Sequence, residues 1–196
     1  MSKLNLKDIM IPTAALVLIC GISTALLAAT NELTKEPIAL SEEQTQEESM
    51  MSVLPKETAD YRAISPKNDP SQCYEAYDKD GNVIAYAISS SSKGYGGTVK
   101  VMTGINAENG EILAVRVYDN SDETPGLGAK TSDDKFSGQF GGASAPKGFT
   151  VSKDADKNPE KQPVDAVTGA TISSRAVIKA VNEAVEIYSK ITGGEK

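Results

Sequence analysis

The chain has 196 residues, a net charge of −7, no His, no Trp and two Cys. This composition excludes a Ser-His-Asp triad, a His-ligated metal and a Cys-rich iron–sulfur or zinc site. Any redox group must therefore be bound, and we expect neither a metal site nor a catalytic side chain in this chain.

Residues 9–30 contain no charged side chain over 22 positions. A helix of that length reaches about 33 Å, enough to span a bilayer, and it exceeds the roughly 7 to 15 apolar residues of a cleaved signal peptide. We expect a single-pass membrane helix at 9–30, with Cys20 among lipids or partner helices. Lys3 and Lys7 precede it and acidic residues follow, which predicts a cytoplasmic N-terminus, residues 1–8, and an extracytoplasmic remainder.

Residues 31–60 form an acidic spacer. Between Glu32 and Asp60 there are eight acidic and two basic residues, a net charge of −6. We interpret this segment as a stalk, within which residues 41–53 predict a short helix that starts at a Ser N-cap and ends before Pro55. The chain has no basic patch interleaved with aromatic residues, so no nucleic-acid partner is expected.

Tyr, Val and Ile recur with a period of two after residue 72. The two clearest turn signals, Asp80-Gly81 and Asn109-Gly110, separate segments of this kind. This pattern predicts an α+β domain, residues 61–192, in which an antiparallel meander of about four strands has one face against helices. Cys73 is expected to be a packed free thiol. The expected strands are residues 73–77, 83–89, 98–105 and 112–118.

Two glycine-rich loops follow strands of this sheet. KGYGG, residues 93–97, is either a simple turn or a surface where backbone approaches a planar ligand. ETPGLGAK, residues 123–130, contains Pro125, which fixes a turn, and two glycines that leave Leu127 projecting. The alternative for this second loop is an ordinary connection to a helix.

The sequence of residues 131–196 predicts two helices and one strand. Residues 131–140 are expected to form a short helix capped by Thr131 or Ser132, and residues 148–152 a strand. Residues 173–191 carry apolar side chains at spacings of three and four, which predicts a helix that ends at Gly193-Gly194, before a short tail, 193–196.

The sequence DAVTGAT, residues 165–171, lies directly before this last helix. Its small residues suit a turn where backbone approaches a ligand, and the helix N-terminus suits a phosphate. The alternative is a turn with an N-cap from Thr171, Ser173 or Ser174. Thr168 and Thr171 together supply more hydroxyls than capping needs, which favours the ligand.

DAVTGAT followed by SSRAV resembles the attachment signature of FMN-binding domains that carry the flavin covalently. In that family a flavin transferase that uses FAD places FMN on the final Thr through a phosphoester. GYGG, NAENGEI and DETPGLGAK occur in the family's order. With its single N-terminal span, the chain is similar over roughly residues 4–190 to the G-subunit family of Rnf ion-translocating electron-transport complexes, and the related C subunits of sodium-pumping NADH:quinone reductases are usually longer.

The resemblance implies FMN bound covalently through its phosphoryl group to Thr171. Ser121 occupies the position where members often have a His, which removes a protonatable group beside the flavin. The resemblance further implies that the flavin transferase recognises residues of the DAVTGAT turn. It also implies that residues of the two glycine-rich loops contact the flavin. These residues are Asp165, Thr168, Gly169 and Ala170 in the turn, and Thr124, Gly126, Leu127, Gly128 and Gly96 in the loops.

The same resemblance implies an electron carrier in the cell membrane that is not catalytic alone. It would relay electrons within a ferredoxin:NAD+ oxidoreductase complex coupled to Na+ or H+ transport, with other subunits, a flavin transferase and the bilayer as partners. The chain itself lacks a GxGxxG after a strand and would not bind NAD. The alternatives are an anchored FMN-domain sensor or structural module, or the C-like subunit of a quinone reductase. A hydrolase with a Thr nucleophile is not expected, because the chain has neither a His nor an N-terminal Thr to serve as the base.

Overall fold

This computed structural model describes residues 6–65 and 71–193, and its first element is a 48-residue helix, α1 (Leu6–Val53). The chain divides within α1 into two units, Met1–Gln44 and Thr45–Lys196. The helix continues through Ser41, so the predicted helix start at this serine is wrong. The predicted end before Pro55 is confirmed, because a helix seldom continues into the residue that precedes a proline.

The first unit is long, apolar and exposed. Among the described residues, one helix, Ile9–Val53, is long and apolar enough to cross a membrane, with a mean hydropathy of 2.2 over its most apolar 18 residues. Large side chains such as Ile11 and Leu27 are exposed along it. This composition is suited to membrane anchoring, because a helix satisfies its own backbone hydrogen bonds in lipid.

The second unit contains an antiparallel sheet with the order β1-β2-β3-β4-β5, which confirms the predicted meander and the α+β class. All four predicted strands are present, and β1 is an additional edge strand whose four residues are exposed. Gly81 and Gly110 have positive φ in the turns where they were expected. The strands are β1 (Asp60–Ala63), β2 (Cys73–Tyr77), β3 (Val83–Lys93), β4 (Thr98–Asn106) and β5 (Ile112–Asp119).

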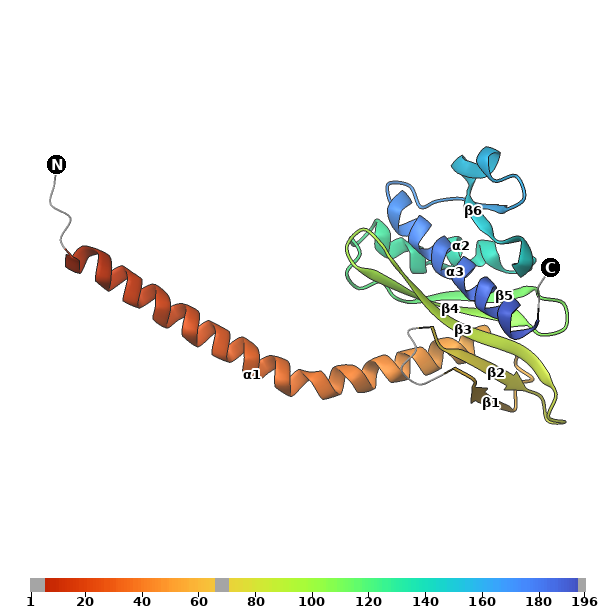
Figure 1. Ribbon diagram of the computed structural model, residues 1–196, viewed down its shortest axis with the longest axis horizontal. Helices are drawn as coiled ribbons and strands as arrows, with labels where there is room; N and C mark the ends of the chain where they lie inside the picture. The colour runs from red at the N-terminus through yellow and green to blue at the C-terminus, as the bar shows by residue number, and fades with distance from the viewer. Residues whose placement is uncertain (1–5, 66–70, 194–196) are drawn as a thin grey trace. The chain divides into compact units, whose positions relative to one another are not determined.

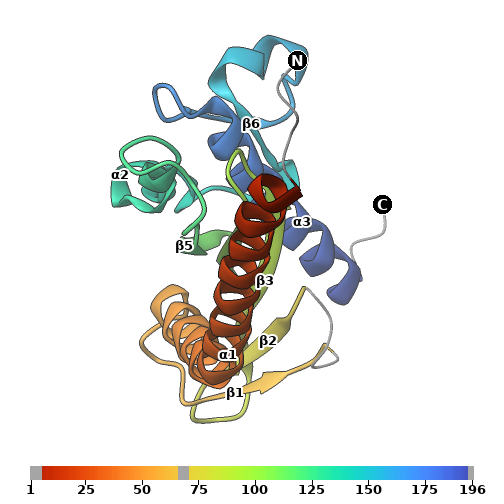
Figure 2. The ribbon, with the colours of Figure 1, turned by 90° about the vertical axis from the view of Figure 1, so that its left-hand side faces the viewer.

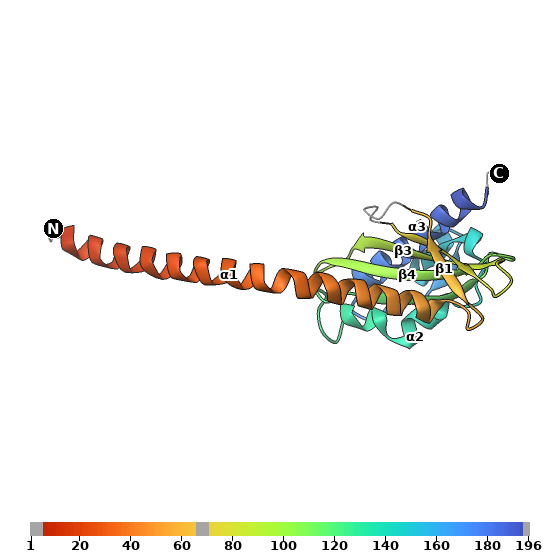
Figure 3. The ribbon, with the colours of Figure 1, turned by 90° about the horizontal axis from the view of Figure 1, so that it is seen from below.

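The end of α1 that belongs to this unit, residues 45–53, packs on one face of the sheet, opposite α3 (Thr171–Ile191) (Figure 3). Met50 and Val53 lie against small side chains, among them Ala87. A Cβ on Gly104 would collide with the Val53 carbonyl oxygen, so only glycine permits this approach. The last part of the predicted acidic spacer, from Thr45 onward, therefore belongs to the folded unit.

Short elements link the sheet to α3. Figures 1 and 2 place them at the opposite end of the unit from β1 and β2. They are η1 (Gly128–Ser132), α2 (Asp134–Ser137), η2 (Gly138–Phe140), η3 (Ala145–Lys147), β6 (Phe149–Val151), η4 (Ser152–Lys157) and β7 (Gln162–Val164), where η marks a 3₁₀ turn. β6 confirms the strand predicted at 148–152 and pairs in parallel with β7, which was not predicted.

The single helix predicted at 131–140 is wrong, because this segment is divided among η1, α2 and η2. Neither Thr131 nor Ser132 caps a helix there. Their hydroxyls instead donate to carbonyl oxygens three residues earlier, those of Gly128 and Ala129, at 2.8 Å in both cases. Local side-chain hydrogen bonds of this kind favour tight turns over a continuous helix.

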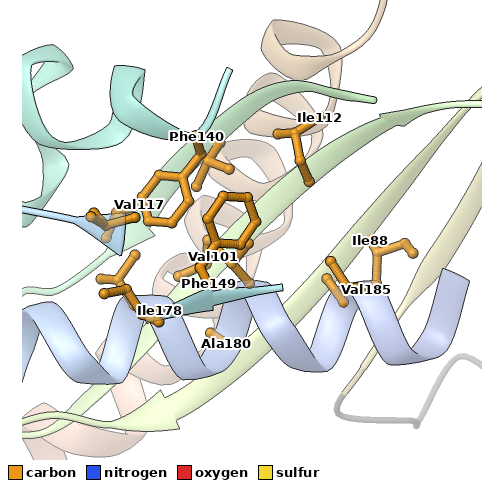
Figure 4. Packing of buried hydrophobic residues seen from close by; sticks show 14 of the residues in the cluster. Ile88, Val101, Ile112, Val117, Phe140, Phe149, Ile178, Ala180 and Val185 are labelled. Atoms are coloured by element: carbon orange, nitrogen blue, oxygen red, sulfur yellow. The ribbon is translucent and has the colours of Figure 1, made fainter. Parts of the chain in front are cut away.

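The main core lies between the sheet and α3 (Figure 4). Phe140 and Phe149 meet edge to face with ring centroids 5.0 Å apart, and Val101 and Ile178 lie beside them. The Ser90 hydroxyl of β3 donates to the Ala180 carbonyl oxygen of α3 at 2.8 Å, which fixes the helix along the strand. Gly193 follows the helix with φ +72°, as predicted, whereas Gly194 and the rest of the tail lie outside the described residues.

Candidate functional site

Thr171 is the first residue of α3, two residues before the predicted start. Among the described residues no side chain caps the helix, so the alternative in which Thr171, Ser173 or Ser174 serves as a cap is not realised. Ser174 accepts a hydrogen bond from the Val167 N–H at 3.0 Å and Ser173 donates to Glu123 at 2.6 Å. Both hydroxyls are thus used by tertiary contacts, and within the described part of the chain the first N–H groups of α3 have no side-chain acceptor.

The Thr171 hydroxyl makes no hydrogen bond to any other part of the chain that the structure describes. Its side chain is half-buried and lines a groove of about 680 Å³. The unpaired N–H groups and positive dipole end of a helix attract an anion. A free hydroxyl at this end of α3 is therefore placed where a phosphoryl group attached to it would be stabilised.

Hydrogen bonds fix both the side chain and the backbone of Asp165, the first residue of the DAVTGAT turn. The Asp165 carboxylate accepts a hydrogen bond from Ser152 at 2.6 Å, and Gln139 exchanges two hydrogen bonds with the Asp165 backbone. Gly169 has φ +79°, a conformation that glycine adopts without strain, and Ala170 N donates to Val167 O at 2.9 Å. The turn exposes Thr168 and Gly169 while its base is fixed.

The groove beside Thr171 has a mixed lining with an excess of positive charge. Asp165, Thr168 and Gly169 line it together with Thr171. Three lysines, Lys130, Lys135 and Lys153, face two aspartates, Asp133 and Asp165, and among the described residues none of the three lysines makes an ion pair. The lysines were not recognised from the sequence because they come from three separate elements.

Leu127 joins the second glycine-rich loop to this turn. It projects with 43% of its surface exposed, and a Cβ added to Gly169 would lie 3.2 Å from Leu127 Cδ2. Thr124 and Gly126 are exposed beside it, and Gly126 has φ +78°. The structure thus places an exposed apolar side chain against the turn that carries Thr171.

Glu123, which sequence reasoning did not single out, connects the loops. Its carboxylate accepts hydrogen bonds from the N–H groups of Tyr95 and Gly96 at 2.7 and 3.3 Å, and from the Ser173 hydroxyl. Gly128 lies against the same carboxylate. The available sequence signal was an acidic residue immediately before the TPGLG sequence.

The remaining predicted residues lie around these contacts. Ala170 is buried at the N-cap position of α3. Gly96 packs against the Asp122 carbonyl oxygen and does not line the groove. Ser121 is exposed, and its hydroxyl donates to Asp119 at 3.0 Å. The structure therefore brings Asp165, Thr168, Gly169 and Thr171 together in one groove, and places Gly96 and Gly128 beside Glu123.

A second groove, of about 770 Å³, contains none of the predicted site residues. It includes Cys73, which is a buried free thiol as predicted, together with Lys179, Glu183 and Glu186 of α3. Burial, and then the charge of Glu75, raises the pKa of Cys73 to about 12. The thiol is therefore neutral at physiological pH and unsuited to redox or nucleophilic chemistry.

The sequence was compared with known families and proteins. It matches the FMN-binding domain over residues 94–186 and the RnfG N-terminal region over residues 1–53. It is 36% identical to the G subunit of the proton-translocating ferredoxin:NAD(+) oxidoreductase complex of Clostridium ljungdahlii, over 93% of each chain. It is 34% identical to the G subunit of the Na(+)-translocating ferredoxin:NAD(+) oxidoreductase complex of Acetobacterium woodii, over 90% of each chain.

Among solved structures, the fold is similar to that of the C subunit of the Na(+)-translocating NADH-quinone reductase from Parabacteroides distasonis. The TM-score is 0.52 at 21% identity, over 64% of this chain and 65% of that chain. This likeness concerns the fold alone. The matches along the whole sequence carry the assignment: the chain belongs to the RnfG family, the G subunits of ion-translocating oxidoreductase complexes, and contains its FMN-binding domain.

Proposed function

We propose that this chain carries FMN covalently on Thr171 and relays electrons within an Rnf-type ion-translocating ferredoxin:NAD+ oxidoreductase complex. The observation that carries the proposal is the Thr171 hydroxyl itself, which makes no hydrogen bond within the described chain and lies at the start of α3 in a lysine-lined groove. The names of the relatives from Clostridium ljungdahlii and Acetobacterium woodii support the choice of complex.

Attachment requires a partner enzyme, because a Thr hydroxyl is a poor nucleophile without a base. In the proposed reaction the Thr171 oxygen forms a bond to the phosphorus of the FMN half of FAD, and the pyrophosphate bond breaks to release AMP. The hydroxyl proton passes to a base of the flavin transferase, whose metal polarises the pyrophosphate. The exposed residues Thr168 and Gly169 give such an enzyme access to the turn.

The chain's own residues fit the attached phosphoryl group. The free N–H groups of α3 and its dipole stabilise an anion by about 0.3–1 kcal/mol, and the lysines of the groove add positive charge. These contributions are modest, so the covalent bond retains the cofactor. When bound, the flavin supplies the capacity to accept and donate electrons.

The flavin ring is proposed to lie against the second glycine-rich loop. Leu127 offers exposed apolar surface directly beside Gly169, two residues from Thr171. Gly126 and Thr124 leave that surface uncovered, and Gly96 presents backbone on the other side of Glu123. With Ser121 in place of a His, the chain supplies no imidazole near this surface.

The proposed placement in the cell follows from the first unit. Residues 9–30 cross the cell membrane with residues 1–8 in the cytoplasm, and the folded unit that contains the FMN domain, Thr45–Lys196, lies on the extracytoplasmic side. The apolar, exposed helix supports the crossing, and the basic N-terminal flank supports the direction. The other subunits of the complex, the flavin transferase and the lipid bilayer are the expected partners.

The attachment is tested by expressing the chain with a flavin transferase and measuring in-gel flavin fluorescence and intact mass. Wild type is expected to gain the mass of an FMN phosphoester, Thr171→Ala to gain none, and Thr171→Ser to retain part of it because a hydroxyl remains. Thr168→Ala, the neighbouring hydroxyl of the same turn, is expected to lower the yield without moving the modified residue. Fluorescence that survives Thr171→Ala refutes the attachment site, and a wild type without added mass refutes the carrier function.

Membership of a complex is tested separately. A tagged chain is expected to co-purify with polytopic membrane proteins of the complex in mild detergent. Purification of the flavinylated chain alone would instead favour an anchored FMN-domain sensor or structural module.

A further inference from the structure

Glu123 is a buried acid with an unusual set of partners. Its side chain is 3% exposed, and no Lys or Arg among the described residues forms an ion pair with it. Oε1 accepts from the N–H groups of Tyr95 and Gly96, and Oε2 accepts from the Ser173 hydroxyl at 2.6 Å. All three partners are donors, the complement that a carboxylate accepts. A charge placed so deeply without a cation is expensive to maintain.

The backbone around this carboxylate is closely packed. A Cβ added to Gly94 would collide with Glu123 Oε1, and one added to Gly128 would collide with Oε2 and lie 2.7 Å from Ser173 Oγ. A side chain at either position would displace the carboxylate. Gly94 and Gly128, one from each glycine-rich loop, thus lie on either side of the Glu123 side chain.

The three partners of Glu123 come from elements that are distant from it in sequence. The GYGG loop joins β3 to β4, Glu123 itself follows β5, and Ser173 belongs to the first turn of α3, two residues after Thr171. A single side chain therefore connects both glycine-rich loops to the helix turn that bears the attachment residue.

We propose that Glu123 is a positioning residue that fixes the GYGG loop and the TPGLG turn against the first turn of α3, and that its buried charge lowers the reduction potential of the flavin. This inference rests on the proposed attachment of FMN to Thr171. Reduction adds negative charge to the flavin, and a nearby buried carboxylate raises the free energy of the reduced form because protein screens it less than water does.

The test uses the full chain, expressed with a flavin transferase. Glu123→Gln keeps the shape and removes the charge, and Asp122→Asn is the matched control because it removes the same charge from an exposed neighbour. Both variants are expected to carry flavin. The midpoint potential of Glu123→Gln is expected to be higher than that of wild type, and that of Asp122→Asn to equal it. Equal potentials in Glu123→Gln and wild type, or equal shifts in the two variants, overturn the electrostatic role.

The positioning role has a readout that needs no flavin. In unmodified protein, hydrogen exchange at the Tyr95 and Gly96 amides is expected to be faster in Glu123→Ala than in wild type. The Phe149 amide, which donates to Asn182, should remain protected and so shows that the variant is folded. Unchanged protection at Tyr95 and Gly96 in a folded variant overturns the proposal. A wild type that takes up no flavin instead contradicts the attachment, and this exchange measurement still decides the role of Glu123.

Discussion

Cys73 makes the stability of the domain sensitive to alkaline pH. Burial raises its pKa from an ordinary value of 9.0 to about 12, so between these values the folded thiol keeps a proton that the unfolded chain loses. The unfolded state then binds fewer protons, and stability falls as pH rises, with a slope of up to about 1.4 kcal/mol per pH unit. Below pH 9 this contribution is fully present.

We expect Cys73→Ala to flatten the fall in melting temperature between pH 9 and pH 11. Thermal unfolding of wild type and variant, followed by circular dichroism at several pH values, measures the two slopes. Tyr188, whose pKa is raised by burial, contributes to both proteins equally and cancels in the comparison. Parallel curves would contradict the assignment to this thiol.

At the scale of single residues, motif reasoning singled out Thr171 and Leu127 but did not predict the hydrogen bonds of the neighbouring side chains. Ser173 and Ser174 were weighed as helix caps, the alternative to a ligand site, because hydroxyl residues favour that position. Their actual partners, Glu123 and the Val167 N–H, are 50 and seven residues away. A sequence shows which hydroxyls are available, whereas tertiary packing decides which one remains free.

At the scale of elements, the docking of β6 on α3 depends on one amide side chain. Asn182 accepts a hydrogen bond from the Phe149 N–H at 2.8 Å and donates to the Phe149 carbonyl oxygen at 2.9 Å. The side chain thus satisfies both backbone groups of a buried residue. Val151 at the end of β6 also lines the groove beside Thr171, so this contact supports a wall of the site.

Asn182→Ala is expected to destabilise the domain by about 1–3 kcal/mol, because it leaves two buried backbone groups without partners. The yield of flavin attachment should fall with it. Lys179→Ala, an exposed change one turn earlier in α3, is the control and should stay within about 0.5 kcal/mol. Chemical denaturation measures the free energy of unfolding of both variants. An equal midpoint for Asn182→Ala and wild type would show that β6 is held by other contacts.

The elements that the sequence predicted correctly are those rich in apolar residues. β4 is buried along most of its length and is bounded by turn signals, and α3 repeats apolar residues along one face. β1 was missed because all four of its residues are exposed and no alternation marks it. Residues 131–140 have helical caps and spacing, but the hydroxyls of Thr131 and Ser132 stabilise tight turns instead. Composition cannot show that competition.

At the scale of the whole molecule, the boundary of the folded unit lies inside a helix. Residues 45–53 of α1 belong to the domain by their contacts: Met50 and Val53 are buried, Gln46 donates to the Tyr74 hydroxyl at 3.2 Å, and Glu47 accepts from Tyr61 at 2.6 Å. The sequence suggested a solvated stalk because charge dominates this stretch. The few apolar residues within it are the ones that pack.

A fragment of residues 45–196 is therefore expected to fold, and one of residues 56–196 to be much less stable. Loss of Met50, Val53 and Leu54 removes burial worth about 1.5–3 kcal/mol for each large side chain, from a total stability of roughly 5–15 kcal/mol. Urea denaturation of the two fragments tests this, with Met50→Ala in the longer fragment as an intermediate case. Equal midpoints would place the boundary after the helix.

The position of α3 after all strands of the sheet in the sequence has a consequence for the order of events during synthesis. The strand residue that fixes it, Ser90, precedes its partner Ala180 by 90 positions, and Glu123 precedes Ser173 by 50. The sheet can therefore pair while α3 is still being synthesised, but the turn before α3 acquires its shape only after α3 itself has emerged and packed on the sheet. If a transferase recognises the shape of this turn, as proposed, it acts after that packing, and flavin fluorescence then reports how many chains have completed it.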